Sequence, residues 1–275
     1  MTSFNTGHNA FGGTQSMQVE ANGIEFNIKI DGHRGSPWLV LSNSLATNLS
    51  MWDRQVEALR DRFRILRYDQ RGHGESDAPA GRYAFNTLVA DIIALMDALE
   101  IQRTHFAGLS MGGMTAVALA GQHPGRVDRV VACDCGPAST PQSAQQWEER
   151  IAQAREHGMQ GLVQPTIERW FPTEFAAANP DTIEKVRHMI RTTPLNGFTG
   201  CAYALSNFDL RPDLAGIRNP MLFICGGKDA SLAGTKALHA AVNGAGFVEI
   251  PGAGHISNME NPTTFTHALQ EFLEA

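Results

Sequence analysis

Short apolar runs alternate with helix-like segments along most of the 275-residue chain, which limits it to a few architectures. Several runs are near-continuous stretches of Val, Ile, Leu and Phe, which is typical of strands covered on both faces. Alternating strands and helices predict an α/β fold, a mostly parallel sheet with helices on both faces. The predicted strands are Ile24–Ile30, Trp38–Leu41, Arg64–Tyr68, Thr104–Gly108, Val127–Cys133, Met221–Cys225 and Gly246–Ile250.

Three segments between and after these strands have helical patterns. Phe85–Leu99 carries its apolar residues on one stripe, and Pro262–Leu273 repeats apolar residues at helical spacing. Met111–Gln122 is small and apolar throughout, which predicts a buried helix.

The alternation stops between Gly136 and Asp213. This stretch is amphipathic and helical and shows no obvious strand, and it is too long for a simple connection. We interpret residues 136–213 as a helical cap over the sheet edge where ligands bind. The core then consists of residues 1–135 and 214–275.

Composition excludes several classes of protein. The chain carries 22 basic and 28 acidic residues, a formal net charge of −6, so it lacks the positive surface of a nucleic-acid-binding protein. No apolar run approaches the roughly 18 residues of a membrane span. Residues Met1–Gly13 resemble a leader without the pattern of a signal peptide, and the four cysteines form no disulfide or zinc pattern, which indicates reduced thiols and a cytoplasmic location.

The segment Gly108-Leu109-Ser110-Met111-Gly112 is the strongest catalytic motif. An apolar strand leads into it and an apolar helix leaves it, the context in which a G-x-S-x-G turn exposes a nucleophilic serine. A side chain at Gly108 or Gly112 is expected to clash in so sharp a turn. The N-terminus of the following helix offers N–H groups to a developing oxyanion.

A serine hydroxyl needs a base, and His255 is the best candidate among ten histidines. It follows the last strand in a Gly-rich loop, whereas His73 is interpreted as a structural residue of a packed turn. In the order serine, acid, histidine, the acid is Asp229, directly after the penultimate predicted strand, or Asp134, one strand earlier. We favour Asp229.

The second oxyanion donor is expected from the loop after the strand Trp38–Leu41. The N–H groups of Leu45 and Met111 are the candidates, with Ser44 as an alternative to Leu45.

Together these residues resemble the α/β-hydrolase superfamily from about Met17 to Leu273 and, more narrowly, the 3-oxoadipate enol-lactonases. Asn43-Ser44 is the most specific marker, because most superfamily members carry His-Gly there. Ala46 departs from the pattern, since these lactonases tend to have Gly at that position. The stretches that carry the resemblance are Leu41–Leu45, Met51–Asp53, Leu66–Asp69, Arg71–Gly74, Gly108–Met114, Glu168–Phe171 and His255–Asn258.

The resemblance implies an eight-stranded α/β-hydrolase sheet and a serine hydrolase that opens a small carboxylate-bearing enol-lactone in aromatic catabolism. It implies no metal or organic cofactor, a small anionic substrate, and no nucleic-acid or membrane partner; a homo-oligomer is left open. An anionic substrate requires a cation in the pocket, for which Arg169, Arg187 and Arg191 are candidates. Trp170 is a candidate pocket wall.

Two other hypotheses about the function remain. The chain is alternatively a different serine hydrolase, such as a carboxylesterase, an acyl-homoserine lactonase or a carbon–carbon bond hydrolase. A receptor on the same fold would bind a ligand without turnover, and the set Ser110, Asp229 and His255 argues against it.

Overall fold

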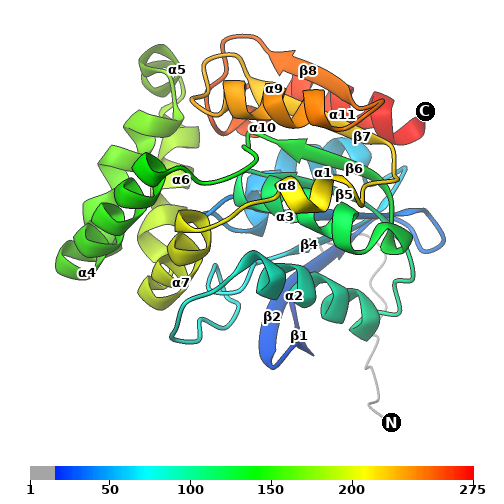
Figure 1. Cartoon of the computed structure of the whole chain (residues 1–275), viewed down its shortest axis with the longest axis horizontal. Helices are drawn as coiled ribbons and strands as arrows, with labels where there is room; N and C mark the ends of the chain where they lie inside the picture. Colours follow the sequence, from blue (N-terminus) through cyan, green and yellow to red (C-terminus); the bar gives the residue numbers. More distant parts are fainter. Residues whose placement is uncertain (1–15) are drawn as a thin grey trace.

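The computed structural model describes residues 16–275 and contains an eight-stranded sheet in the order β1-β2-β4-β3-β5-β6-β7-β8 (Figure 1). The leader expected over Met1–Gly13 lies outside the described residues. Strand β2 runs antiparallel to both of its neighbours, and all pairs from β4 to β8 are parallel. The strands are β1 (Met17–Ala21), β2 (Ile24–Asp31), β3 (Trp38–Ser42), β4 (Arg64–Tyr68), β5 (Thr104–Leu109), β6 (Val127–Cys133), β7 (Met221–Gly226) and β8 (Gly246–Ile250).

The mostly parallel α/β sheet predicted from the sequence is confirmed, and the seven predicted strands agree with the structure to within one residue at each end. Strand β1 was not among them. It pairs with β2 through the turn at Asn22 and Gly23, and its side chains alternate between exposed and more buried instead of forming an apolar run. A sheet edge of this kind needs less apolar sequence than a central strand.

Helices cover both faces of the sheet, and successive residues of each strand pack on opposite faces. In β3, Leu39 and Leu41 join one apolar cluster, whereas Val40 joins the other. The first cluster includes residues of α1 and α11, and the second includes residues of α2, α3 and α9. The helices of this part are η1 (Leu49–Trp52), α1 (Asp53–Leu59), α2 (Phe85–Ala98), α3 (Met111–Gln122), η2 (Pro124–Arg126), α8 (Arg211–Leu214), α9 (Leu232–Ala241), α10 (Ser257–Glu260) and α11 (Pro262–Glu274).

Of the five helices between β6 and β7, the first four gather at one side of the sheet (Figure 1). They are α4 (Pro141–Trp170), α5 (Thr173–Ala178), α6 (Pro180–Thr192) and α7 (Leu195–Ser206). Their apolar residues continue the cluster of the α1 and α11 face, so the same core runs from the sheet into these helices. We call α4 to α7 the side helices.

Helix α4 folds back on itself at Gly158, whose φ of 66° and ψ of −178° lie in a region open essentially only to glycine. Pro165 lacks the N–H that would bond the Gly161 carbonyl in a regular helix. The Gln153 side chain from the first half of α4 donates to that carbonyl instead, at 3.3 Å. The kink therefore brings the two halves of α4 into contact.

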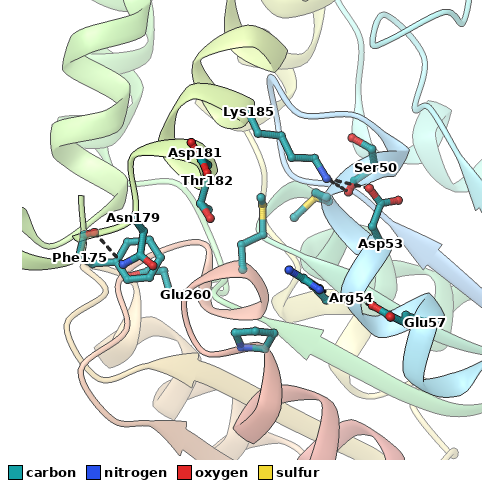
Figure 2. A pocket seen from close by; sticks show the side chains of 13 residues that line it. Ser50, Asp53, Arg54, Glu57, Phe175, Asn179, Asp181, Thr182, Lys185 and Glu260 are labelled. Carbon is teal, nitrogen blue, oxygen red and sulfur yellow. Dashed lines mark hydrogen bonds and ion pairs between the residues drawn. The ribbon is translucent and has the colours of Figure 1, made fainter. Parts of the chain in front are cut away.

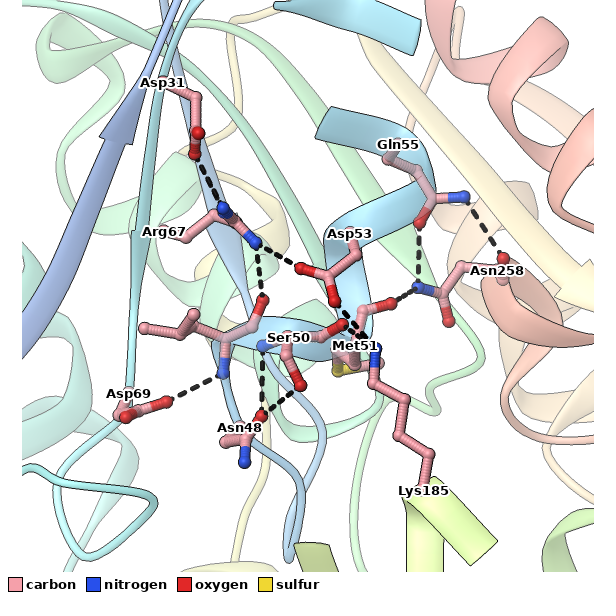
Figure 3. Close-up of polar contacts among 11 residues, drawn as sticks. Asp31, Asn48, Ser50, Met51, Asp53, Gln55, Arg67, Asp69, Lys185 and Asn258 are labelled. Carbon is pink, nitrogen blue, oxygen red and sulfur yellow. Dashed lines mark hydrogen bonds and ion pairs between the residues drawn. The ribbon is translucent and has the colours of Figure 1, made fainter. Parts of the chain in front are cut away.

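Charged groups link the side helices to the sheet (Figure 3). Arg67 on β4 donates to Asp31 at 2.8 Å and to Asp53 at 2.7 Å. Lys185 on α6 reaches the other oxygen of Asp53 at 2.7 Å and the carbonyl of Ser50 at 2.8 Å. A continuous set of ion pairs thus runs from the sheet through α1 to α6.

Candidate active site

Ser110 lies between β5 and α3 in a strained conformation, with a φ of 56° and a ψ of −113°. Positive φ is costly for a residue with a Cβ atom and persists where the surrounding structure enforces it. A Cβ atom on Gly108 would overlap the Gly112 carbonyl, and one on Gly112 would overlap the Ser42 carbonyl. The steric requirement for both glycines is therefore confirmed, and the turn holds the hydroxyl of Ser110 at the carboxyl end of the sheet.

His255 and Asp229 meet Ser110 in a continuous hydrogen-bonded chain. His255 Nε2 lies 2.9 Å from Ser110 Oγ, and His255 Nδ1 lies 3.1 Å from both carboxylate oxygens of Asp229. Ser231 adds a short hydrogen bond to Asp229, and its backbone N–H donates to the same carboxylate at 3.2 Å. This geometry matches a nucleophile, a base and an acid that orients the base.

The charges of the pair stabilise each other. Burial alone would raise the pKa of Asp229, but the charge of His255 and its hydrogen bond outweigh burial and hold the pKa below its usual value. Burial alone would lower the pKa of His255, but Asp229 outweighs it and raises that pKa. An imidazolium formed during reaction is thereby stabilised, as general base catalysis requires.

Asp134, the alternative acid, lies near the triad but bonds other groups. Its carboxyl group accepts from the Gly226 N–H at 2.8 Å and from the Ser257 hydroxyl at 2.5 Å. Complete burial, and then the nearby charge of Asp229, raise the pKa of Asp134. Asp134 thus links the end of β7 to α10 behind the triad, and its carboxyl group is not hydrogen-bonded to the His255 ring.

The backbone N–H of Met111 lies between two neighbours that are already bonded. The N–H of Ser110 donates to the Cys133 carbonyl at 2.8 Å, and that of Gly112 donates to the Asn43 carbonyl at 3.0 Å. The Met111 N–H, at the start of α3, has no acceptor among residues 16–275. It is therefore free to receive an oxyanion.

The loop after β3 leaves the Leu45 N–H free in the same way. The Ser44 N–H points to Met51 Sδ at 3.4 Å, and the Ala46 N–H donates to His73 Nε2 at 2.9 Å. The Leu45 N–H has no acceptor within the described residues. Burial lowers the pKa of His73 to about 4, so its ring stays neutral and accepts this bond. Ala46 has a φ of 57°, a backbone conformation that glycine adopts at a lower cost than alanine.

Glu260 fixes the loop that carries the catalytic histidine. Its carboxylate accepts from the N–H of Gly254 at 2.8 Å and from the N–H of Ile256 at 3.1 Å, the residues on either side of His255. Burial raises the pKa of Glu260 to about 7. Glu260 is not among the residues predicted from the sequence, because nothing in a single α10 residue indicates two backbone partners in the preceding loop.

The end of α4 lies directly on this loop. The Trp170 carbonyl accepts from the His255 N–H at 2.7 Å, and the Trp170 and His255 rings are 5.8 Å apart. Arg169 is exposed and lies close enough for its charge to lower the pKa of His255. Arg169 is therefore the cation candidate adjacent to the triad, and its neighbour Trp170 contacts the catalytic histidine.

The other two cation candidates have partners within the side helices. Arg191 donates to Gln160 at 2.9 Å and lies 3.5 Å from Glu184. Arg187 donates to Gln164 at 3.0 Å. The structure does not bring either guanidinium into contact with the triad.

A cavity of about 490 Å³ lies between the side helices and the sheet (Figure 2). Lys185 and Asp53 border it, and Glu260 connects it to the histidine loop. None of the three triad residues lines it, so it is distinct from the space in front of Ser110. Its lining residues are Ser50, Met51, Asp53, Arg54, Glu57, Phe175, Asn179, Asp181, Thr182, Lys185, Met259, Glu260 and Pro262.

Within residues 16–275, one group of side chains is compact enough to be considered as a metal site. The candidate ligand atoms of Asp134, Cys225 and Asp229 lie within 4.8 Å of one another. Both carboxyl groups are already committed to the hydrogen bonds described above, and burial raises the pKa of the Cys225 thiol. The group is therefore suited to supporting the triad and offers a poor donor set for a metal. All four cysteines are free and buried. None of the described helices is both long and apolar enough to cross a membrane.

Known proteins resemble this chain over most of its length. The alpha/beta hydrolase fold family matches residues 37–262. The chain is 36% identical to 3-oxoadipate enol-lactonase 2 of Acinetobacter baylyi over 258 residues, which are 93% of this chain and 96% of that protein. The crystal structure of the enol-lactonase from Burkholderia xenovorans LB400 has a TM-score of 0.91 and 41% identity, covering 94% of this chain and all of the other.

A second kind of relative carries a different activity in its name. The chain is 30% identical over 247 residues to RutD of Pseudomonas syringae, which is named as a carbamate hydrolase. The match covers 88% of this chain and 95% of RutD.

Proposed function

The chain belongs to the α/β-hydrolase fold family and is a hydrolase, and we propose that it opens 3-oxoadipate enol-lactone to 3-oxoadipate. The observation that carries the catalytic part is the hydrogen-bonded set of Ser110, His255 and Asp229. The similarity to two enol-lactonases over nearly the whole chain supports the substrate. This reaction belongs to the catabolism of aromatic compounds.

In the first half of the proposed reaction, Ser110 Oγ attacks the lactone carbonyl while His255 Nε2 takes its proton. The N–H groups of Leu45 and Met111 donate to the oxyanion. Each such donor contributes roughly 3–4 kcal/mol to lowering the barrier in comparable sites. The carbon–oxygen bond of the ring then breaks, and the leaving enolate takes a proton and becomes a ketone.

In the second half, water hydrolyses the acyl-enzyme. His255, again neutral, removes a proton from the water as it attacks the Ser110 ester carbonyl. The tetrahedral intermediate collapses, Ser110 regains its proton, and 3-oxoadipate leaves with two carboxylates. Asp229 holds the tautomer of His255 and stabilises the imidazolium in both halves.

Residues 136–213 act as a cap in this proposal, and Arg169 and Trp170 form the part of it nearest the reacting atoms. The protein carries a net charge of −6, so an anionic substrate needs a local cation. Arg169 supplies that charge beside the triad. We assign no substrate contact to Arg191, because its guanidinium is paired with Gln160 and Glu184.

The test is turnover of the enol-lactone by the purified chain, followed as loss of lactone and appearance of 3-oxoadipate. We expect turnover, and we expect the Ser110→Ala variant to show none above background. Turnover of a simple aryl ester with no turnover of the enol-lactone would reject the enol-lactone as the substrate, while hydrolase activity would stand.

A carbamate is the second candidate substrate, because a relative 30% identical is named for carbamate hydrolysis. The same triad chemistry applies to a carbamate carbonyl. Ammonia release from carbamate in a parallel assay separates the two proposals.

A further inference from the structure

Asp134 is a buried acidic group that the proposed reaction does not use. It follows β6 at the carboxyl end of the sheet, its side chain is fully buried, and its φ of 51° is uncommon for a residue with a Cβ atom. A conformation of this kind persists where the surrounding structure enforces it, most often beside a functional site. The contacts of Asp134 show what it does for the neighbouring triad.

The carboxyl group of Asp134 joins the two segments that carry the acid and the base. Its Oδ1 accepts from the N–H of Gly226, the last residue of β7 and shortly before Asp229, at 2.8 Å. Its Oδ2 lies 2.5 Å from Oγ of Ser257, which begins α10 just after His255. One side chain thus fixes the loop of the general base to the strand that leads to its acid.

The same two segments also pack directly against each other. A Cβ atom on Gly226 would lie 2.0 Å from the carbonyl oxygen of Gly254, the residue before His255. Any separation of β7 from this loop therefore moves the imidazole relative to Ser110. A displacement of about 1 Å at a catalytic group lowers a rate by as much as about 100-fold.

A proton on Asp134 suits this arrangement. An oxygen of Asp134 lies within 4.8 Å of an oxygen of Asp229, and two neighbouring buried carboxylates do not readily ionise together. Asp229 takes the charge, because it bonds the His255 ring. Burial, and then the charge of Asp229, raise the pKa of Asp134 to about 8. With its proton on Oδ2, Asp134 donates to the Ser257 hydroxyl and still accepts from Gly226 through Oδ1.

The surroundings of Asp134 contain little that would balance a negative charge. Within residues 16–275, neither a lysine nor an arginine bonds its carboxyl group. Burial raises the pKa of the three thiols around it, so they are neutral. The charge of His255 favours the ionised form, but burial and Asp229 outweigh it. The titratable groups that face Asp134 are Cys133 and Cys135 on either side of it in the chain, Cys225 of β7, Asp229 after β7, and His255.

We propose that Asp134 is a positioning residue that works in its neutral form: its protonated carboxyl group holds the His255 loop against the end of β7, and ionisation at alkaline pH weakens this attachment. The ionised group has no proton to donate, and its charge repels that of Asp229. Activity is then fully present below the pKa of Asp134 and falls as the pH rises through about 8. This inference rests on the proposed triad of Ser110, His255 and Asp229.

The experiment measures kcat and KM for 4-nitrophenyl acetate between pH 6 and pH 9.5 in wild type, Asp134→Asn and Asp134→Gly. Asparagine keeps a neutral donor and an acceptor, and both replacements tolerate the positive φ. The ratio of kcat in Asp134→Asn to kcat in wild type should rise about 3- to 10-fold from pH 7 to pH 9.5, because only wild type loses the neutral form. Asp134→Gly should lose about 10- to 100-fold in kcat at pH 7 with KM changed by less than about threefold, because a misplaced base affects the chemical step.

Two further variants test the other end of the bond and the other end of the strand. Ser257→Ala removes the partner hydroxyl and should lower kcat about as much as Asp134→Gly, and the double variant should lose little more than the larger single loss. Asp128→Asn lies at the amino end of β6, where the 40% exposed side chain pairs with Arg103 at 2.9 Å, and it should leave kcat and its pH profile unchanged. The pH dependence of Asp134→Asn decides the proposal even where Asp134→Gly fails to fold, which urea denaturation detects.

Labelling of Ser110 by a fluorophosphonate gives a second readout that needs no turnover. Its rate in wild type should fall relative to that in Asp134→Asn as the pH rises. Parallel pH profiles for these two proteins, or wild-type kcat in a folded Asp134→Gly, would overturn the proposal. Failure to label Ser110 at any pH would reject the triad and with it this role of Asp134, whereas failure to open the enol-lactone would reject the proposed substrate and leave this role standing.

Discussion

Arg71 and Arg150 are two guanidiniums in similar surroundings with opposite electrostatic arrangements. Arg71, in the sheet part, lies 5.9 Å from the Tyr83 ring centre and bonds both oxygens of Asp91, at 2.8 and 2.5 Å. This fork raises the pKa of Arg71. Arg150, in the side helices, also lies over an aromatic ring but has a hydroxyl as its partner, and its pKa falls to about 10.

The difference separates two tasks. In the sheet part, buried charges are satisfied within the protein, since Arg67 bonds Asp31 and Asp53 and the triad acid bonds His255. Such a scaffold holds its catalytic groups in fixed positions whether or not a ligand is present. In the side helices, Arg150 and Arg169 have no carboxylate within 4 Å among residues 16–275. The sheet part thus holds Ser110, Asp229 and His255 in an internally bonded arrangement, whereas two arginines of the side helices lack an acidic partner.

Removal of the nucleophile is the strongest test of this division. Ser110→Ala should lower kcat by about 10⁵-fold or more for charged and neutral esters alike, because both depend on the same attack. The free energy of unfolding should stay close to that of wild type, as measured by urea denaturation. Activity within tenfold of wild type would place the nucleophile elsewhere.

The two buried acids beside His255 offer the next test. Asp229→Asn should lower kcat by roughly 10³- to 10⁴-fold, because the amide no longer holds the histidine in the productive tautomer. Asp134→Asn should cost far less: the raised pKa of Asp134 already favours the neutral form, and asparagine tolerates its φ of 51°. Steady-state kinetics on one aryl ester compares the two. A larger loss for Asp134→Asn would reverse the assignment of the acid.

The sequence predicts the sheet part far better than the side helices, and the reason is physical. Strand periodicity and the turn around Ser110 are local properties, so the strands, the nucleophile and the loop carrying His255 follow from short stretches. The approach of Arg150 to Arg169 depends on one glycine conformation and on packing between two halves of a helix. Helical periodicity does not predict that fold-back. The sequence therefore indicates Arg169, Arg187 and Arg191 as equivalent candidates and does not indicate Arg150.

Glu260 is an exception in the sheet part, since no cation lies within 4 Å of it among the described residues. Burial raises its pKa from 4.5 to about 7, so the folded chain binds this proton more tightly than the unfolded chain. The resulting stability is fully present below pH 4.5 and is lost as the pH rises through 7. Wild type should therefore lose roughly 2–3 kcal/mol relative to Glu260→Gln between pH 5 and pH 8.

Urea denaturation of wild type and Glu260→Gln at pH 5, 6, 7 and 8 measures this difference. Parallel pH profiles for the two proteins would contradict the raised pKa. The subtraction removes most of the contribution of His255 and Asp229, because their charges affect the pKa of Glu260 less than burial does.

Gly158 tests whether the fold-back of α4 is needed for the arginine pair. No atom lies within 4 Å of a Cβ built there, so Gly158→Ala creates no clash, yet its backbone conformation should cost about 1–3 kcal/mol. Gly125→Ala is the matched control, because that glycine also has open space and no positive φ, and it should change stability by less than about 0.5 kcal/mol.

Lys185 should have the smallest effect, although it bonds two groups across the boundary between the side helices and the sheet part. The side chains of Lys185 and Asp53 are 38% and 51% exposed, and an exposed pair of this kind contributes about 0–1 kcal/mol. Lys185→Met should therefore lower the free energy of unfolding by less than about 1 kcal/mol, as measured by urea denaturation. The shared apolar core, which runs from the sheet into α4, α6 and α7, then holds the two parts together. A loss of several kcal/mol would mean instead that this ion pair is needed to hold the side helices against the sheet part.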